Sequence, residues 1–198
     1  MMRFRNILAV MLAITLLTVN SFAAEKFEID KTHSIISFTV RHMSIAKVTG
    51  QFREFSGTIY YDEQDITKSS VNVTIKTVSV DTGNDNRDNH LRTGDFFNAP
   101  TDSLITFVSK TIEKQGDGYV AVGDFTLRGV TKEVSLPFTI LGKVKDQRGN
   151  TRIGIEATLT LNRFDYGVKW DRKFDESSLV VGENVNIYLA IEAISSKQ

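Results

Sequence analysis

The chain has 198 residues, no cysteine, and 24 basic side chains against 24 acidic ones. The absence of cysteine excludes disulfides, thiolate metal sites, a cysteine nucleophile and a lipoprotein anchor, which needs a cysteine at its cleavage point. The balanced charge argues against nucleic acid as a partner, because neutralising phosphates requires clustered lysine and arginine.

The N-terminus carries the pattern of an export signal. Arg3 and Arg5 precede an apolar run over residues 7–19, in which only two threonines are polar. Ser21 and Ala23 place small residues at the −3 and −1 positions of a signal-peptidase site, which predicts cleavage after Ala23. The run is shorter than the roughly 20 residues of a membrane span. An uncleaved anchor is therefore the less favoured alternative, and no stable membrane insertion is expected after cleavage.

The mature chain, residues 24–198, is predicted to form one domain dominated by β-strands. Apolar and polar side chains alternate with a period of two, which is typical of half-buried strands. Glycine-containing turns at 115–118, 128–131 and 147–150 indicate short connections, and short connections join antiparallel neighbours. The alternation marks eight strands, at 36–42, 55–62, 71–76, 105–107, 124–128, 133–140, 156–161 and 185–192.

Eight strands with one apolar face each can close into a barrel or pack as a sandwich. Closure removes exposed strand edges, which otherwise promote aggregation. The interior of an eight-stranded barrel is either filled by side chains or able to hold one small ligand. The periodicity leaves both possibilities open.

Two segments interrupt the alternation and are expected at the rims of a barrel. Residues 86–97 predict a short helix or turn-rich insertion with Leu91, Phe96 and Phe97 on its inner face. The second segment, 163–178, contains the only tryptophan, Trp170, which we expect to pack over one end of the barrel.

The polar residues form no recognisable catalytic or metal motif. His33, His42 and His90 lie at uneven spacing, and the acidic run 81–88 lacks the glycine and terminal glutamate of an EF-hand calcium loop. That run is interpreted as a solvated turn with a helix N-cap. Arg163 could receive a phosphate or carboxylate, although a rim ion pair with Asp165 or Asp171 is the favoured interpretation. No metal, cofactor or catalytic residue is predicted.

A series of motifs runs through essentially the whole mature chain. The motifs are Asp30–Ser34, Phe38–Met43, Gly50–Phe52, Phe55–Gly57, Arg87-Asp88 with His90-Leu91, Asp95–Phe97, Gly123–Lys132, Asn162–Gly167 and Val180–Val185. In this order they resemble the YceI-like family, also called polyisoprenoid-binding proteins. The segment after Gly167 is more charged than the family pattern.

The resemblance implies an all-β, eight-stranded antiparallel, lipocalin-like barrel in the periplasm of a bacterium. It also implies that the interior holds an isoprenoid or another long-chain lipid. His42, His90 and Arg163 are then candidate headgroup contacts. Strand parity selects the expected lining residues, which are Ile36, Phe38, Val40, Phe55, Ile59, Val73, Ile75, Phe107, Phe125, Leu136, Phe138, Leu159, Ile187 and Leu189.

Three functions are compatible with the sequence. The favoured one is a carrier or sequestering protein for such a lipid. The alternatives are an enzyme that acts on a lipid headgroup with His42 or His90 as base, and a filled barrel that serves as an envelope interaction module. The sequence leaves the identity of the lipid and the oligomeric state open, a homodimer included.

Overall fold

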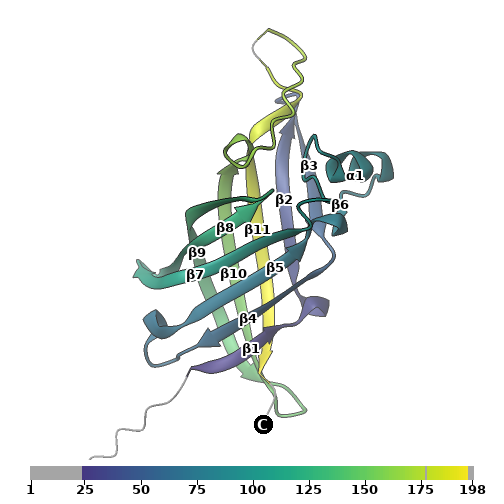
Figure 1. Ribbon diagram of the computed structural model, residues 1–198. Coiled ribbons are helices and arrows are strands. Elements are labelled where there is room, and N and C mark those ends of the chain that lie inside the picture. The colour runs from purple at the N-terminus through teal and green to yellow at the C-terminus, as the bar shows by residue number, and fades with distance from the viewer. Residues whose placement is uncertain (1–23, 177, 196–198) are drawn as a thin grey trace, which may run out of the picture.

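The computed structural model describes residues 24–176 and 178–195, so the predicted export signal lies outside the described residues. The described chain is mainly antiparallel β-structure, as Figure 1 shows. No helix of the described part is long and apolar enough to cross a membrane. The strands are β1 (Glu25–Ile29), β2 (Ile35–His42), β3 (Ala46–Phe52), β4 (Phe55–Tyr61), β5 (Ser70–Lys76), β6 (Val80–Asp81), β7 (Leu104–Gln115), β8 (Gly118–Leu127), β9 (Val130–Lys145), β10 (Thr151–Asn162) and β11 (Val181–Ser195). The helices are α1 (Asp85–Arg92) and the 3-10 turns η1 (Lys31–His33), η2 (Ile66–Lys68), η3 (Thr77–Ser79) and η4 (Arg163–Tyr166).

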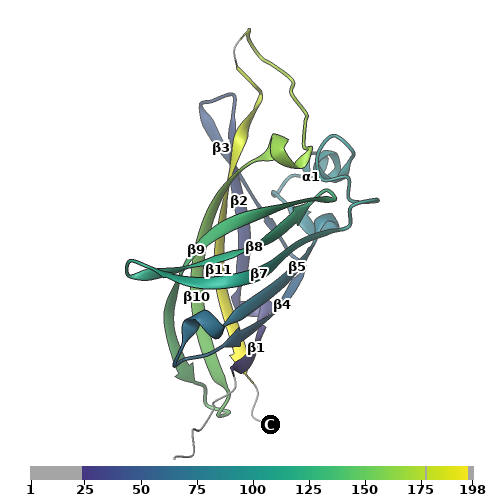
Figure 2. The same cartoon turned by 60° about the vertical axis from the view of Figure 1, so that its left-hand side comes forward.

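The sheet closes into a barrel because β1 pairs with β4 on one side and with β11 on the other. β2 follows β1 after a bend and pairs with the next part of β11. In the same way, β3 and β4 form one bent strand, and β5 and β6 form another. Each bent pair counts as one strand of the barrel. The ring therefore has eight antiparallel strands, which confirms the predicted fold class. Figure 2 shows β7, β8 and β9 crossing steeply over β10 and β11.

The predicted strands differ from the observed ones mainly at bends. The short strand β1 was missed because Phe27 is its only large apolar residue before Ile29. The strand β3 was missed because Lys47, Thr49 and Gly50 dilute its apolar signal. The strand β8 begins at Gly118, six residues before its predicted start, because consecutive apolar residues there hide the period of two.

The three predicted hairpin turns are confirmed. Gly116, Gly129 and Gly149 have φ angles of 58°, 70° and 81°, values that side chains with a Cβ rarely adopt. These glycines reverse the chain between β7, β8, β9 and β10. The sequence signal was strong here because tight hairpins need residues with positive φ.

The predicted helix is α1, and the acidic run before it is the predicted capped turn. The side chain of Asn84 accepts a hydrogen bond from the backbone N–H of Arg87, which satisfies a free donor of the first helical turn. The buried carboxylate of Asp88 accepts hydrogen bonds from the N–H and hydroxyl of Thr82. The side chains of Asn84 and Asp88 therefore fix the start of the helix.

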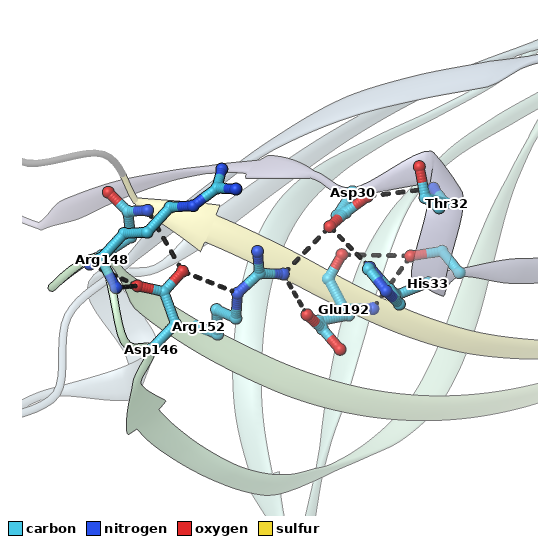
Figure 3. A network of polar contacts seen from close by, with 9 residues as sticks. Asp30, Thr32, His33, Asp146, Arg148, Arg152 and Glu192 are labelled. Atoms are coloured by element: carbon cyan, nitrogen blue, oxygen red, sulfur yellow. Dashed lines mark hydrogen bonds and ion pairs between the residues drawn. The ribbon is translucent and has the colours of Figure 1, made fainter.

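A polar network ties the first strand of the barrel to the last two (Figure 3). The Arg152 guanidinium on β10 lies 3.0 Å from Asp30 and 3.1 Å from Asp146, and it also pairs with Glu192 on β11. Asp30 in turn accepts hydrogen bonds from the ring of His33, at 2.8 Å, and from the N–H of Thr32. The pKa of Asp30 is lowered to about 2, mainly by its hydrogen bond with His33 and further by Arg152.

Replacing Asp30 with asparagine is expected to lower the free energy of unfolding at pH 7 by about 2 kcal/mol. A carboxylate with a depressed pKa stabilises the fold above its unfolded pKa, and this contribution is lost as the pH falls from about 4 towards 2. Urea unfolding of Asp30→Asn should therefore show a smaller stability loss than the wild type across this pH range. Asp117→Asn, in the exposed β7–β8 turn, is the control and should change stability by less than about 0.5 kcal/mol. Equal stability of Asp30→Asn and wild type at pH 7 would contradict this role.

Candidate lipid-binding cavity

The interior of the barrel contains a cavity of about 230 Å³. Every strand of the barrel contributes to its wall, and so do α1, η2 and η4. Nearly all of the lining side chains are aliphatic or aromatic. Such a cavity offers water few hydrogen-bond partners and favours an apolar occupant.

The half-buried side chains of β9, β10 and β11 show that the barrel is hollow. Leu136, Phe138 and Leu159 point inward, line the cavity and are still partly exposed. On the facing wall, Ile105 and Phe107 are buried. Because these side chains point into the barrel, their exposed area faces the cavity. Strand parity allowed either a filled or a hollow interior, and the structure has a hollow one.

Most of the residues predicted by parity do border the cavity, although their contact with a ligand stays a prediction. They border the cavity because every second side chain of a barrel strand points inward. The predicted residues that the structure places on the wall are Ile36, Phe38, Val40, Ile59, Val73, Ile75, Phe107, Phe125, Leu136, Phe138, Leu159, Arg163, Ile187 and Leu189.

One predicted lining residue and two predicted headgroup contacts do not border the cavity. Phe55, the first residue of β4, is half-buried and packs against the core without bordering the cavity, so its prediction as a lining residue was wrong. His42 is the last residue of β2, opposite Val181, which does line the cavity. His90 lies on α1 and packs against Phe96 of the wall. Contact of either histidine with a headgroup stays a prediction.

One end of the barrel is closed by a small apolar plug. Phe27 and Ala193 are completely buried, and Ile59 and Ile153 pack with them at 8% and 1% exposure. These residues come from β1, β4, β10 and β11, so hydrogen-bonded strands hold the plug in place. A ligand would have to break this packing to pass through the end.

The opposite end, here called the cap end, is covered by the two segments that interrupt the strands. Phe96 follows α1 and lines the cavity, and the ring of Trp170 packs on it with centroids 5.4 Å apart. The Arg128 side chain, in the β8–β9 turn, donates hydrogen bonds to the carbonyls of Gly94 and Phe96. Leu91 and Phe97 also reach the cavity, as the inner face of this insertion predicted. The cover thus consists of side chains on short irregular segments rather than on a strand ladder.

Arg163 is a structural residue of the cap end. Only 4% of its surface is exposed, and its guanidinium donates hydrogen bonds to the carbonyls of Val168, Val181 and Gly182 at 2.7–2.9 Å. Burial lowers its pKa. The predicted ion pair with Asp165 or Asp171 was wrong: Asp165 pairs with Lys132, and among the described residues no ion pair joins Arg163 to Asp171. Arg163 therefore joins η4 to the start of β11.

The histidines do not converge on one site. His33 bonds to Asp30 near the plugged end, whereas His90 lies 2.8 Å from Asp95 and packs edge-on against Phe96 and Trp170. The His90–Asp95 pair has the form of a base with an acidic partner, but it sits outside the cavity wall. Within the described ranges, one group of potential metal ligands was found, and it consists of His33 with Asp30 and Glu192. Arg152 already contacts both carboxylates of that group, so their charge is balanced by the protein itself.

The YceI-like domain model matches residues 27–193, which is nearly the whole described chain. The chain belongs to the YceI-like family. Protein YceI of Salmonella newport is 34% identical over 98% of this chain and 99% of its own length. The crystal structure of a YceI protein from Campylobacter jejuni is 30% identical, with a TM-score of 0.68 over 79% of this chain and 90% of that chain. A polyisoprenoid-binding domain from Saccharophagus degradans shares the fold, with 17% identity and a TM-score of 0.60 over 87% and 99% of the two chains.

Several residues in the YceI-like motifs of this chain shape turns rather than the cavity. Asp30 caps η1 through the N–H of Thr32, and Asn162 caps η4 through the N–H of Phe164. Gly167 ends η4 with a φ of 73°, which favours glycine. The polar motif residues are thus explained by the backbone geometry they fix.

Parity along the recognised strands missed part of the wall of this YceI-like barrel. Phe52 lines the cavity from β3 and packs on Phe38 with centroids 5.8 Å apart. The spacing of Val48 and Phe52 is a period-two signal, but a weak one because Gly50 stands between them. The Gly50 position is narrow because a Cβ there would meet the Phe38 ring at 2.4 Å. Ile66 on η2 had no comparable signal, because a single 3-10 turn has no periodic pattern.

Proposed function

We propose that this protein is a periplasmic binding protein that carries or sequesters a polyisoprenoid, or a similar long-chain amphiphilic lipid, inside its barrel. The observation that carries the proposal is the apolar cavity enclosed by the strand ring. The Saccharophagus domain of the same fold, described as polyisoprenoid-binding, supports it. The predicted export signal and the occurrence of YceI relatives in Gram-negative bacteria support a periplasmic location.

The binding energy would come from burial of the lipid chain. Each Å² of apolar surface removed from water contributes roughly 25 cal/mol, part of which is offset by the ordering of chain and protein. In the described chain, no buried side-chain nitrogen or oxygen lacks a hydrogen-bond partner. The accessible wall of the cavity is apolar, so selection inside the barrel rests on the shape and apolarity of the lipid chain.

The headgroup is placed at the cap end in this proposal. The opposite end is plugged by fully buried side chains between paired strands, whereas the cap end is covered by Phe96, Trp170 and the segments that bear them. A polar headgroup left outside the cavity avoids the cost of burial without hydrogen bonds.

Binding rather than catalysis is favoured by the placement of the polar groups. A rim enzyme needs a base within hydrogen-bond reach of its substrate. His90 with Asp95 is the one histidine–carboxylate pair that the described chain has near the cap end, and neither residue lines the cavity. The double variant His42→Gln/His90→Gln should therefore retain lipid binding.

Titration with a long polyprenyl phosphate, followed by tryptophan fluorescence, tests the proposal. Trp170 is the only tryptophan, and it packs on a residue of the cavity wall, so occupation of the cavity should shift its emission in a saturable way. A short prenyl phosphate of the same headgroup is the control and should bind at least tenfold more weakly, because it buries less apolar area. Equal affinity for the two ligands would show headgroup binding and contradict the proposal.

A further inference from the structure

The hairpin between β2 and β3 presents two apolar side chains to solvent at its tip. Ile45 is 83% exposed and Met43 is 36% exposed. Met43 and Ser44 both have positive φ, 47° and 61°, and the N–H of Ile45 donates to the carbonyl of His42. This is the geometry of a tight type I′ turn, which normally contains asparagine and glycine. A large apolar residue in this turn departs from the usual preference, and such departures are expected at functional sites.

Another exposed apolar side chain, that of Phe174, lies near this turn. The N–H of Met43 donates to the carbonyl of Val180, and the N–H of Val180 donates to the carbonyl of Arg172, both at 2.9 Å. The N–H of Phe174 likewise donates to the carbonyl of Ser178, and the side chain of Phe174 is 39% exposed. We call Met43, Ile45 and Phe174 the apolar tip. In Figure 1 and Figure 2, the β2–β3 hairpin and this segment project from the same end of the barrel, the cap end.

Charged side chains of both signs lie around the apolar tip, and those of the β2–β3 hairpin beside it are basic. Arg41 and Lys47 are exposed and face each other across β2 and β3, a like-charge pairing that opposes hairpin formation. In the described part of the chain, no ion pair includes either of them. Three further exposed cations lie in the neighbouring segment, Lys169, Arg172 and Lys173, and the acidic residues of the same region are Asp171, Asp175, Glu176 and Glu183.

We propose that the apolar tip docks onto the surface of a lipid bilayer that contains anionic lipids. The turn over residues 41–47 supplies two large apolar side chains, two basic side chains and no acidic one. Apolar side chains that enter the headgroup region, together with adjacent cations, are the usual elements of interfacial membrane binding. The acidic residues lie in the neighbouring segment, so we assign the main contact to the β2–β3 turn.

Docking at this end would bring the cover of the cavity against the bilayer. This inference rests on the proposed function, because a carrier of a membrane lipid must exchange its ligand with a membrane. Trp170 and Phe174 belong to the same segment, 168–180, so contact of Phe174 with lipid would act on the segment that covers the cavity. The lipid chain would then leave or enter the barrel without crossing water.

Co-sedimentation with vesicles that contain no isoprenoid tests docking separately from cargo binding. The mature protein should bind vesicles of phosphatidylglycerol and phosphatidylcholine, and bind pure phosphatidylcholine vesicles more weakly, with the difference reduced by salt. Met43→Ser/Ile45→Ser should weaken binding at least tenfold, and Arg41→Gln/Lys47→Gln should weaken it roughly tenfold on the anionic vesicles only.

The matched control is Leu141→Ser/Val144→Ser, which removes two apolar side chains that are each 64% exposed on β9, away from the tip. This control should bind vesicles as the wild type does. The Met43→Ser/Ile45→Ser variant and the control variant should both keep the wild-type melting temperature and affinity for detergent-solubilised polyprenyl phosphate. A failure of cargo binding would therefore be detected separately from a failure of docking. Absence of vesicle binding by the wild type, or equal loss in the tip and control variants, would overturn the docking proposal.

Discussion

Replacement of Leu136 and Leu189 by tryptophan is expected to reduce lipid binding more than tenfold. Both side chains line the cavity from the same wall, on β9 and β11 at either side of β10, and both are partly exposed to it. The larger rings would occupy space that the lipid chain needs. Because the rings enter an existing void, the free energy of unfolding should fall by no more than the 1–3 kcal/mol that is typical of overpacked cores.

Binding is measured with a radiolabelled polyprenyl phosphate, and folding with urea unfolding. The control is Leu141→Trp, at a position that is 64% exposed on the outside of β9. It should bind the label as the wild type does. Undiminished binding by the double tryptophan variant would place the ligand outside the cavity.

Replacement of Arg163 by leucine should lower the free energy of unfolding by about 3 kcal/mol or more. The substitution removes the guanidinium and leaves three carbonyl acceptors without their donor, in a region where Arg163 is almost fully buried. Lysine cannot restore the planar set of donors, so Arg163→Lys should recover only part of the loss.

Arg148→Leu, in the exposed turn between β9 and β10, is the matched control and should cost less than about 0.5 kcal/mol. Chemical unfolding of the three variants measures the difference. A wild-type midpoint for Arg163→Leu would show that the guanidinium does not hold the cap end together. Lost lipid binding at unchanged stability would instead return Arg163 to the role of a headgroup contact.

The barrel could be predicted from the sequence because its main signals are local. The alternation of Leu136 and Phe138 with exposed neighbours follows from strand geometry, and the glycine turns follow from backbone sterics. The missed strands are those in which this local signal is weak, as in β3 around Gly50. Their pairing is fixed by distant partners in the barrel.

The candidate site was predictable in its apolar part and not in its polar part. Arg163 is followed by two acidic residues within eight positions, which suggested an ion pair, yet its partners include carbonyls of Val181 and Gly182 on another strand. Backbone carbonyls carry no sequence signal. His42 shares a strand face with Phe38, but parity says nothing about where along the strand the cavity ends.

Native mass spectrometry of the protein purified from periplasmic extract, followed by solvent extraction and lipid identification, tests the central claim most directly. We expect a protein whose first residue is Ala24, with one chain lipid bound per barrel and released by solvent. A bare protein mass that is unchanged after incubation with isoprenoid quinones, polyprenyl phosphates and fatty amides would contradict the claim that the barrel is a lipid carrier.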